Sequence, residues 1–318
     1  MDAPRDRRRR LVSSGPFLLV NPRSGDGSPT VDELVAAARE KGVETELLHE
    51  GADAAEHARA ALQRGATVLG VAGGDGTLAD VAQVAVEAEA AFVAVPFGTR
   101  NHFARDAGYD RGDPLAALDA FAGGVERDVD VGVVCGRLFL NNVSLGVYAA
   151  FVHDTDQRTK NRVLAGLRMI PAVFGRSRRP LDLSFDVDGT RQHHRALVVL
   201  VANNDYGFET LADLEGRERL DEGRLHAYVI EAAKRRTLLA LLWRVLRGRT
   251  DRAAGWVEYA AESFRVEFHR PSLQAAIDGE PVELEPPFDF EVRAGALRLL
   301  LPKTSSSRDE REAAGARQ

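Results

Sequence analysis

Strand-like and helix-like segments alternate through the first 128 residues of this chain, and this alternation restricts its possible folds more than any other feature. The strand-like segments are residues 17–20, 43–50, 67–72 and 91–98. Two of the intervening helical segments, residues 30–42 and 52–65, end at a glycine. Strands separated by helices of this length pair in parallel, so we expect a three-layer α/β domain over residues 14–128.

The pattern changes near residue 129, where segments typical of β-hairpins replace most of the helices. The clearest hairpins are residues 128–146, 181–204 and 273–284. Two helical stretches, residues 157–174 and 237–247, interrupt the strands. We therefore expect a second, largely antiparallel β domain over residues 129–302, with a ligand cleft between the two domains.

The composition indicates a globular protein of a reducing compartment. Of its 318 residues, 44% are hydrophobic, which is enough to build the cores of two domains. The single cysteine, Cys135, cannot form an internal disulfide, and no secretory signal is predicted. A net charge of -6 argues against a nucleic-acid partner. The basic residues 1–13 and the polar residues 303–318 are predicted to be disordered tails.

A glycine-rich loop follows the third predicted strand and has the composition of a phosphate-binding loop. Gly73, Gly74 and Gly76 lack a Cβ atom, so their backbone permits a sharp turn and also the close approach of an anion. The amides at the start of the next helix point toward such an anion, and Thr77 adds a hydroxyl group. Asp75 places a carboxylate beside the expected phosphate. This is favourable only with a cation between them, and nucleotide-bound Mg²⁺ is the one expected.

Two common phosphate-binding motifs, the P-loop and the dinucleotide-binding pattern, do not match this loop completely. A P-loop requires a Gly-Lys pair, which the chain lacks. Residues 74–79 fit the G-x-G-x-x-A pattern of dinucleotide-binding folds. However, residues 94–96, where an acidic ribose ligand is expected, read Ala-Val-Pro. A plain glycine turn is the remaining alternative.

Two further polar loops follow other predicted strands. Residues 21–27 come after the first strand and residues 96–106 after the fourth. Because the carboxyl ends of parallel strands meet at one edge of a sheet, we expect all three loops to lie side by side. Three polar, glycine-bearing loops at one edge favour a phosphate site over turns alone.

Several different short motifs follow one another along the chain, three in its first half and three in its second half. Those of the first half are Asn21-Pro22-x-Ser24-Gly25, Gly73-Gly74-Asp75-Gly76-Thr77 and Pro96-x-Gly98-Thr99-x-Asn101-x-Phe103-Ala104. Those of the second half are Asn203-Asn204-x-Tyr206, Leu220-Asp221-Glu222-Gly223-x-Leu225 and Ile277-Asp278-Gly279-Glu280. Over residues 16–300 the chain thus resembles the diacylglycerol kinase catalytic domain superfamily, which includes bacterial lipid kinases and the sphingosine and ceramide kinases.

The resemblance implies an α/β nucleotide-binding domain followed by an antiparallel β-sandwich domain, with the active site between them. It implies an ATP-dependent lipid kinase that transfers the γ-phosphoryl group of Mg-ATP to a lipid hydroxyl. The lipid would be diacylglycerol-like, or a ceramide or sphingoid base. The residues that it assigns to the nucleotide are Asn21, Ser24, Gly25, Gly73, Gly74, Gly76, Thr77, Gly98, Thr99, Asn101 and His102.

Acidic groups from opposite domains are candidates for the base that accepts the proton of the attacking hydroxyl. Resemblance to bacterial lipid kinases assigns this role to the motif of Asp278 and Glu280, whereas resemblance to sphingosine kinases assigns it to Asp75. We favour Glu280 as the base, with Asp75 as a metal ligand. An Asp-Gly pair is also a frequent hairpin turn, so residues 278–280 are alternatively a plain turn.

Two positions depart from the family pattern. His102 stands where many relatives have an aspartate, so an imidazole replaces a group that would help to order Mg²⁺. It could contact phosphate, accept a different lipid headgroup or simply pack. Glu222 stands in a motif that often reads Asp-Asp-Gly, where some bacterial relatives hold a structural Mg²⁺, and it is a candidate ligand for such an ion.

A lipid substrate implies contact with a membrane surface. Residues 237–247 combine leucines with flanking arginines, as an interfacial helix does, and residues 158–180 are basic. A core helix and a solvated basic rim are the alternatives. We expect a cytoplasmic protein that reaches the inner membrane face as a peripheral protein.

Other functions compete with the lipid kinase hypothesis. An NAD kinase-like enzyme has a related fold with the same Gly-Gly-Asp-Gly loop, but the loops at residues 21–27 and 96–106 argue against it. A dinucleotide oxidoreductase is a more distant alternative. A degenerate kinase fold that binds lipid or nucleotide without turnover is the non-enzymatic alternative, and His102 is the feature that favours it.

Overall fold

The computed structural model describes most of both predicted domains. The described residues are 15–25, 27–146, 180–187, 189–206, 216–231, 256–269 and 271–303. The predicted helical stretches 157–174 and 237–247 lie outside them, as do nearly all of the basic stretch 158–180 and of the two predicted tails. Among the described residues, no helix combines the length and the apolar character that crossing a bilayer requires.

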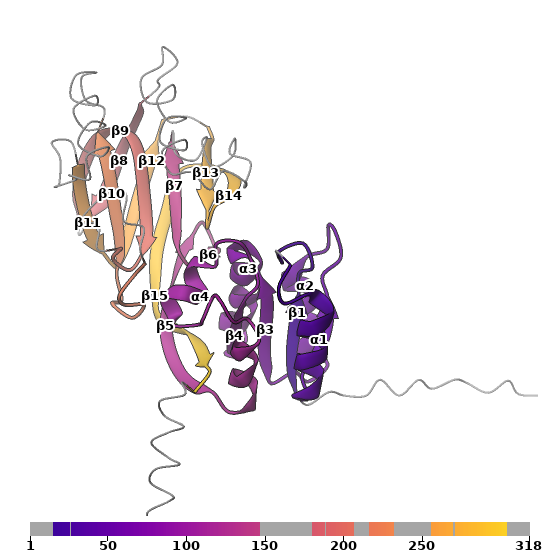
Figure 1. Cartoon of the computed structure of the whole chain (residues 1–318). Coiled ribbons are helices and arrows are strands. Elements are labelled where there is room, and N and C mark those ends of the chain that lie inside the picture. Colours follow the sequence, from indigo (N-terminus) through magenta and orange to yellow (C-terminus); the bar gives the residue numbers. More distant parts are fainter. Residues whose placement is uncertain are drawn as a thin grey trace, which may run out of the picture.

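The first lobe is a three-layer α/β unit built on a parallel sheet, as the alternation predicts (Figure 1). Its parallel strands, in spatial order, are β4 (Ala91–Pro96), β3 (Val68–Gly73), β1 (Pro16–Val20) and β2 (Glu44–Leu47). Its helices are α1 (Val31–Glu40), α2 (Ala54–Gln63), α3 (Asp75–Glu87), α4 (His102–Ala107) and the 3-10 helix η1 (Ala116–Ala122). The register pairs Val20 with Ala72 and Gly73 with Pro96, so the loops after β1, β3 and β4 begin at one sheet edge.

Local sequence signals account for the starts of the first two helices, α1 and α2. Thr30 and Glu33 form a reciprocal capping box at the start of α1, as expected from their spacing. Asp53 caps α2 by accepting hydrogen bonds from the amides of Ala55 and Glu56. The buried face of α1, which includes Leu34, packs into the same apolar core as the sheet.

The second lobe is a β-sandwich-like unit of antiparallel strands. Its strands are β5 (Val125–Val134), β6 (Arg137–Phe139), β7 (Asn142–Gly146), β8 (Leu181–Val187), β9 (Thr190–Asn203), β10 (Leu225–Glu231), β11 (Trp256–Ala261), β12 (Ser263–Phe268), β13 (Leu273–Ile277), β14 (Glu280–Leu284) and β15 (Phe288–Leu301). The pairs β5–β6, β8–β9 and β13–β14 confirm the three predicted hairpins. The first part of β9 pairs with β8, and its last part lies between β7 and β10. A second apolar core lies among these strands.

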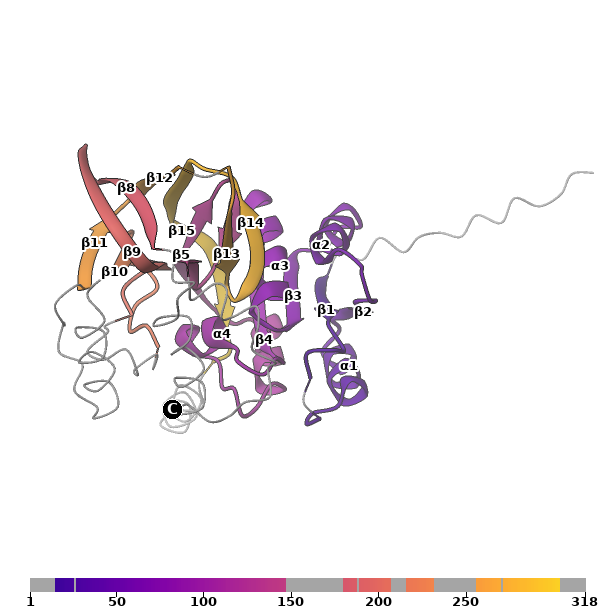
Figure 2. The ribbon, with the colours of Figure 1, turned by 90° about the horizontal axis from the view of Figure 1, so that it is seen from above.

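The last strand, β15, connects the two lobes, and the hairpin pattern did not predict it. Its first residues pair with β12 in the second lobe, and Leu299 pairs with Phe92 of β4 in the first. Along most of its length β15 pairs with β5, and the two strands run from one lobe into the other (Figures 1 and 2). Leu297 and Leu299 are buried in the first core, so the chain returns to the α/β lobe at its end.

A buried ion pair also joins the lobes. Nε of Arg217, in the loop before β10, lies 3.0 Å from Oδ2 of Asp106 in α4, and both side chains are at most 1% exposed. The guanidinium also donates to the carbonyl oxygens of Leu140 and Asn203 and to the side-chain oxygen of Asn141. Its charge and its donors are therefore both satisfied away from water.

We expect Arg217→Ala to lower the free energy of unfolding by about 3–5 kcal/mol, because it leaves the buried Asp106 carboxylate with Arg105 alone and removes the buried donor to the oxygens of Leu140, Asn141 and Asn203. Urea denaturation followed by circular dichroism measures this change. Arg219→Ala is the matched control, since that side chain is 62% exposed and pairs with Asp221 at the surface. Equal denaturation midpoints for the two variants would contradict the prediction.

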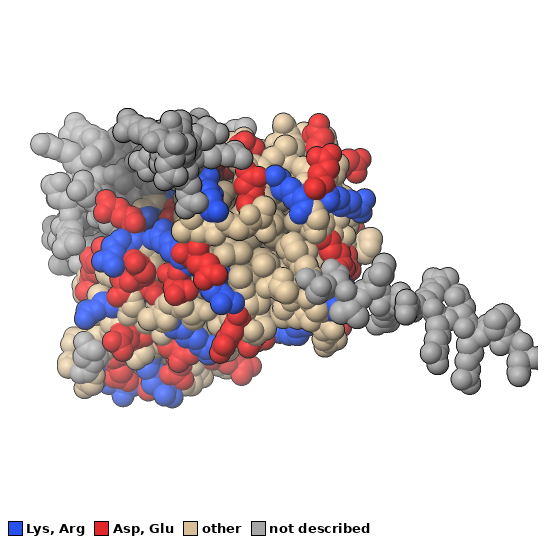
Figure 3. All heavy atoms as spheres, turned by 90° about the horizontal axis from the view of Figure 1, so that it is seen from below, with Lys and Arg blue, Asp and Glu red and all other residues tan. Residues whose placement is uncertain are grey.

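The charged side chains of the surface are mixed in sign. On the face in Figure 3, lysines and arginines lie among aspartates and glutamates. Across the described surface, several charged side chains form exposed pairs, such as Lys41 with Asp119 and Arg59 with Glu87. Such pairs contribute little to stability, and the mixture weakens the electric field that this face presents.

Candidate active site

The three polar loops meet at the carboxyl edge of the parallel sheet. Nδ2 of Asn21, directly after β1, donates a hydrogen bond of 3.1 Å to Oγ1 of Thr77 in α3. The hydroxyl of Ser24 accepts a hydrogen bond of 3.2 Å from the amide of Gly74. Four residues that the sequence assigned to one site are thus in direct contact as two pairs, which are 50 and 56 positions apart in the sequence.

The third loop packs directly on the other two. A Cβ atom on Gly98 would lie 2.7 Å from Cα of Gly74, and one on Gly25 would lie 2.5 Å from the ring of Phe97. Asn101 has a positive φ of 47°, and its side chain accepts from the amide of Gly98 and donates to its carbonyl oxygen. Glycine at positions 25 and 98 is therefore required by the close contact of the loops.

We expect Gly98→Ala to weaken ATP binding at least about tenfold and to lower stability by about 1–3 kcal/mol, because the added methyl group forces the backbones of Gly98 and Gly74 apart. Nucleotide titration and thermal unfolding measure the two effects separately. ATP affinity equal to that of the parent would show that the contact between these loops is not needed for the site.

Asp75 ties the glycine-rich loop to the third loop. Its carboxylate oxygens accept hydrogen bonds of 3.2 Å from the amides of His102 and Phe103, the first two residues of α4. Asp75 therefore caps α4, whose own N-cap residue, Asn101, makes no side-chain cap. Only 9% of Asp75 is exposed, so its charge is held close to the loops.

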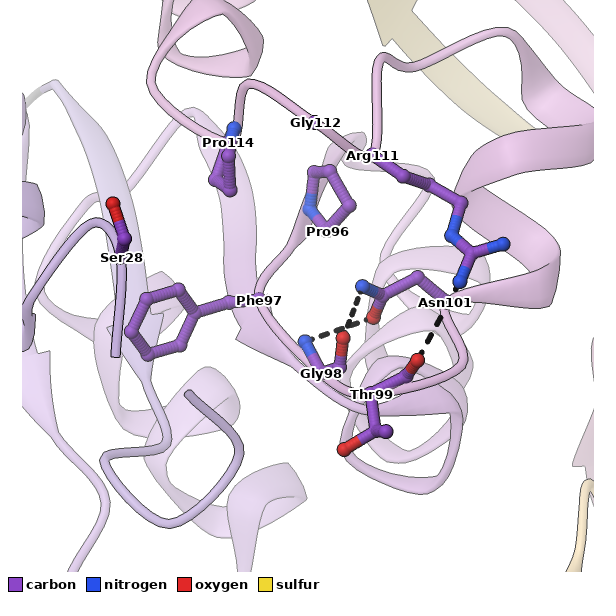
Figure 4. Close-up of a pocket in the computed structure, with 9 residues that line it drawn as sticks. All are labelled: Ser28, Pro96, Phe97, Gly98, Thr99, Asn101, Arg111, Gly112 and Pro114. Atoms are coloured by element: carbon purple, nitrogen blue, oxygen red, sulfur yellow. Dashed lines mark hydrogen bonds between the residues drawn. The ribbon is translucent and has the colours of Figure 1, made fainter. Parts of the chain in front are cut away.

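The start of α3 is open to an anion. Its N-cap is Gly74, which has no side chain to satisfy the first amides of this thirteen-residue helix. Free amides and the positive end of the helix dipole are the groups that bind phosphate, so the loops fit a nucleotide phosphate. Beside them lies a cavity of about 250 Å³ lined by Ser28, Pro96, Phe97, Gly98, Thr99, Asn101, Arg111, Gly112 and Pro114 (Figure 4).

The late acidic motif is a hairpin turn that reaches the first lobe. Asp278 and Gly279 both have positive φ, 48° and 87°, as in the tight turn that an Asp-Gly pair favours between β13 and β14. The turn places Glu280 against the glycine-rich loop, since a Cβ atom on Gly76 would lie 1.8 Å from Oε1 of Glu280. Residues 278–280 can therefore form a plain hairpin turn and still place Glu280 in the candidate active site.

Asp278 is held by backbone amides. Its carboxylate accepts hydrogen bonds of 2.7 to 3.0 Å from the amides of Leu140, Asn141 and Asn142. Burial raises the pKa of Asp278 to about 7, the nearby Asp75 also raises it, and the three amides oppose this rise. Its contacts are those of a positioning residue that holds the turn in place.

Two other titratable groups line the same region. Partial burial raises the pKa of Asp80 to about 6, although its surface is partly exposed, and the Glu280 carboxylate adds to the rise. Burial lowers the pKa of His102 and the nearby Asp75 opposes this, so a neutral imidazole is favoured at pH 7.

One predicted site residue lies elsewhere, and some residues near the site lacked a motif signal. Glu222 is in the second lobe, where Oε2 lies 3.3 Å from Nε2 of His226. Arg111 donates to the carbonyl oxygen of Thr99 from a turn-rich loop, where nothing in the sequence marks it. Arg100 approaches Gly279, and only its position inside the third loop could have indicated it.

Comparison with known proteins agrees with this arrangement. Residues 16–134 match the family model "Diacylglycerol kinase catalytic domain", and residues 142–301 match "YegS C-terminal NAD kinase beta sandwich-like domain". A Pseudomonas aeruginosa protein named "Probable lipid kinase YegS-like" is 30% identical over 88% of this chain and 92% of its own. A Bacillus subtilis protein named "Diacylglycerol kinase" is 27% identical over 72% and 76%.

Solved structures show the same fold. A diacylglycerol kinase structure from Bacillus anthracis str. Sterne superimposes with a TM-score of 0.66 at 18% sequence identity, covering 91% of this chain and 97% of that one. The likeness includes both lobes, since nearly the whole of each chain is aligned. The chain therefore belongs to the diacylglycerol kinase family, together with the YegS-like lipid kinases.

Proposed function

We propose that this protein is an ATP-dependent lipid kinase that transfers the γ-phosphoryl group of Mg-ATP to a lipid hydroxyl. The contact of Glu280 with Gly76 is the observation that supports this most, because it brings a carboxylate of one lobe to the phosphate-binding loop of the other. The names of relatives, "Diacylglycerol kinase" and "Probable lipid kinase YegS-like", favour a lipid as the acceptor. The acceptor is diacylglycerol-like, or a ceramide or sphingoid base.

The first lobe supplies the nucleotide site. The open amides at the start of α3 would hold the phosphates, with Thr77 and Asn21 at their side. Mg-ATP supplies the phosphoryl group, and its Mg²⁺ neutralises part of the charge that develops during transfer. Asp75 would retain Mg²⁺ near the phosphates, and it also holds α4 in place.

The second lobe supplies the base. Among the described residues of this lobe, Glu280 reaches the phosphate-binding loop, where the lipid hydroxyl must approach the phosphorus atom. In this role its carboxylate accepts the hydroxyl proton as the new bond forms. Asp278 positions Glu280 through the three amides that anchor the turn.

The membrane surface is the place where the two substrates meet. We infer that the protein works in the cytoplasm and reaches the inner membrane face by peripheral contact, because its lipid substrate resides there. The arginine-rich segments 158–180 and 237–247 are the sequence features that support this inference. The sequence supports no nucleic-acid partner, given the net charge of -6.

The test is an acceptor screen with purified full-length protein. Labelled ATP and Mg²⁺ are incubated with diacylglycerol, ceramide, sphingosine and NAD in separate reactions, and the products are separated by chromatography. We expect label in one or more lipids. Label in NAD alone would replace this function with that of an NAD kinase. ATP binding without any product would indicate a binding module.

A further inference from the structure

A buried histidine surrounded by carboxylates lies in the second lobe, apart from the three loops of the active site. His226 is in β10, Asp205 follows β9, and Glu258 is in β11. One ligand atom from each of the three lies within 4.8 Å of the others. The register pairs Tyr228 with Glu258, and side chains two apart on a strand share a face, so the cluster is built on one face of the β10–β11 pair.

The two ring nitrogens of His226 have different surroundings. Nε2 lies 3.3 Å from Oε2 of Glu222, which in turn accepts a hydrogen bond from the amide of Asp205. Nδ1 lies 3.5 Å from Oε1 of Glu258 and 3.9 Å from Oδ1 of Asp205. Only 9% of His226 is exposed, and among the described residues its buried Nδ1 has no hydrogen-bond partner. A buried nitrogen left in this state is costly unless a further group completes it.

We propose that Nδ1 of His226 and the carboxylates of Asp205 and Glu258 bind a divalent transition-metal ion of the zinc type. Two ligands of a tetrahedral zinc ion, with bonds of about 2.1 Å, lie about 3.4 Å apart. The separation of 3.5 Å between Nδ1 and Oε1 of Glu258 matches this spacing. One imidazole and two carboxylates suit Zn²⁺ or Mn²⁺, whereas Mg²⁺ prefers oxygen ligands and retains its waters.

The surrounding groups support the same assignment. A metal-bound histidine usually donates its other N–H to a carboxylate, and Glu222 is placed to accept it. The hydroxyl of Tyr228 donates a hydrogen bond of 2.5 Å to Oδ1 of Asp205, which orients that carboxylate. Glu222 and Tyr228 are therefore positioning residues, and Glu222, expected from its motif to be a metal ligand, acts through the histidine.

The ion would fasten an edge of the second lobe. Among the described strands β11 pairs with β10 alone, so it is an edge strand. Glu258 would link this edge through the ion to β10 and to the end of β9. Metal binding is thus expected to stabilise the folded lobe, independently of nucleotide and of the proposed reaction.

The experiment uses full-length protein without a histidine tag, stripped of metal with a chelator and kept free of nucleotide. Titration with ZnCl₂ in a calorimeter is expected to give one bound ion per chain, and saturating Zn²⁺ to raise the melting temperature by about 5 °C. Substitution with Co²⁺ adds visible absorption bands typical of a tetrahedral site. A stripped parent protein that binds no Zn²⁺ would overturn the proposal.

Variants locate the ion. Glu222→Gln is expected to weaken Zn²⁺ binding about 10- to 100-fold, and His226→Gln and Glu258→Gln to weaken it more. His57→Gln is the matched control, because that imidazole also lies beside a glutamate, Glu46 at 2.8 Å, but in the first lobe. If His226→Gln does not fold, the Co²⁺ spectrum of Glu258→Gln shows whether the ion binds at this cluster. Zn²⁺ affinity and a Co²⁺ spectrum unchanged in Glu258→Gln would place the ion elsewhere.

Discussion

Replacing Asp75 with asparagine is expected to lower kcat about 100- to 1,000-fold, the largest loss that we predict for a single change in the first lobe. The variant removes the negative charge that we assign to Mg²⁺ retention. It also turns one acceptor of the α4 amides into a donor, because the carboxylate accepts from both His102 and Phe103. The variant therefore loses both the negative charge near Mg²⁺ and a hydrogen bond that holds the start of α4 in place.

The measurement is single-turnover phosphoryl transfer from labelled ATP at increasing Mg²⁺. Asp75→Asn is expected to require more Mg²⁺ than the parent as well as to react more slowly. Asp32→Asn is the matched control, since Asp32 also lies in the first turn of a helix, α1, but is exposed and outside the three loops. Equal kcat and equal Mg²⁺ dependence in Asp75→Asn and the parent would remove Asp75 from the metal site.

Replacing Glu280 with glutamine is expected to lower kcat about 100- to 10,000-fold while ATP affinity stays close to that of the parent. The amide keeps the size of the side chain that lies against Gly76, but it cannot accept the hydroxyl proton. A loss in kcat without a loss in binding is the signature of an interaction made only in the transition state.

The control for Glu280 is available on the same strand. Glu283 is also in β14, and its carboxylate accepts from the hydroxyl of Ser272, away from the glycine-rich loop. Glu283→Gln is expected to react as fast as the parent. If Glu280→Gln does so as well, the base is another group, and Asp75 becomes the favoured candidate.

The order of elements could be predicted where the signal is local. Thr30 and Glu33 form the expected capping box, and the hairpin at residues 273–284 turns at its Asp-Gly pair. Strand β15 was not predicted, because its apolar alternation is broken where the register to β5 shifts between Arg293 and Leu297. Only pairing with strands of both lobes makes its two parts one strand.

The residues of the candidate site, like the elements of the fold, could be predicted only where the signal in the sequence is local. The residues of the three loops were predictable, because parallel pairing alone brings Asn21, Thr77 and Gly98 to one sheet edge. The partners of their side chains were not. Asp75 caps a helix 27 positions further on, and Asp278 binds amides 136 to 138 positions away, so no local pattern records either contact.

The amino-acid sequence by itself determined the two kinds of sheet, the glycine-rich loops and the family resemblance, since hydrophobic period and turn residues act over short stretches of chain. The tertiary structure decided which carboxylate reaches which lobe. Glu280 meets Gly76 and Glu258 meets His226 because strand pairing fixes these positions in space. Contacts of this kind depend on how whole elements pack, which the order of residues does not display.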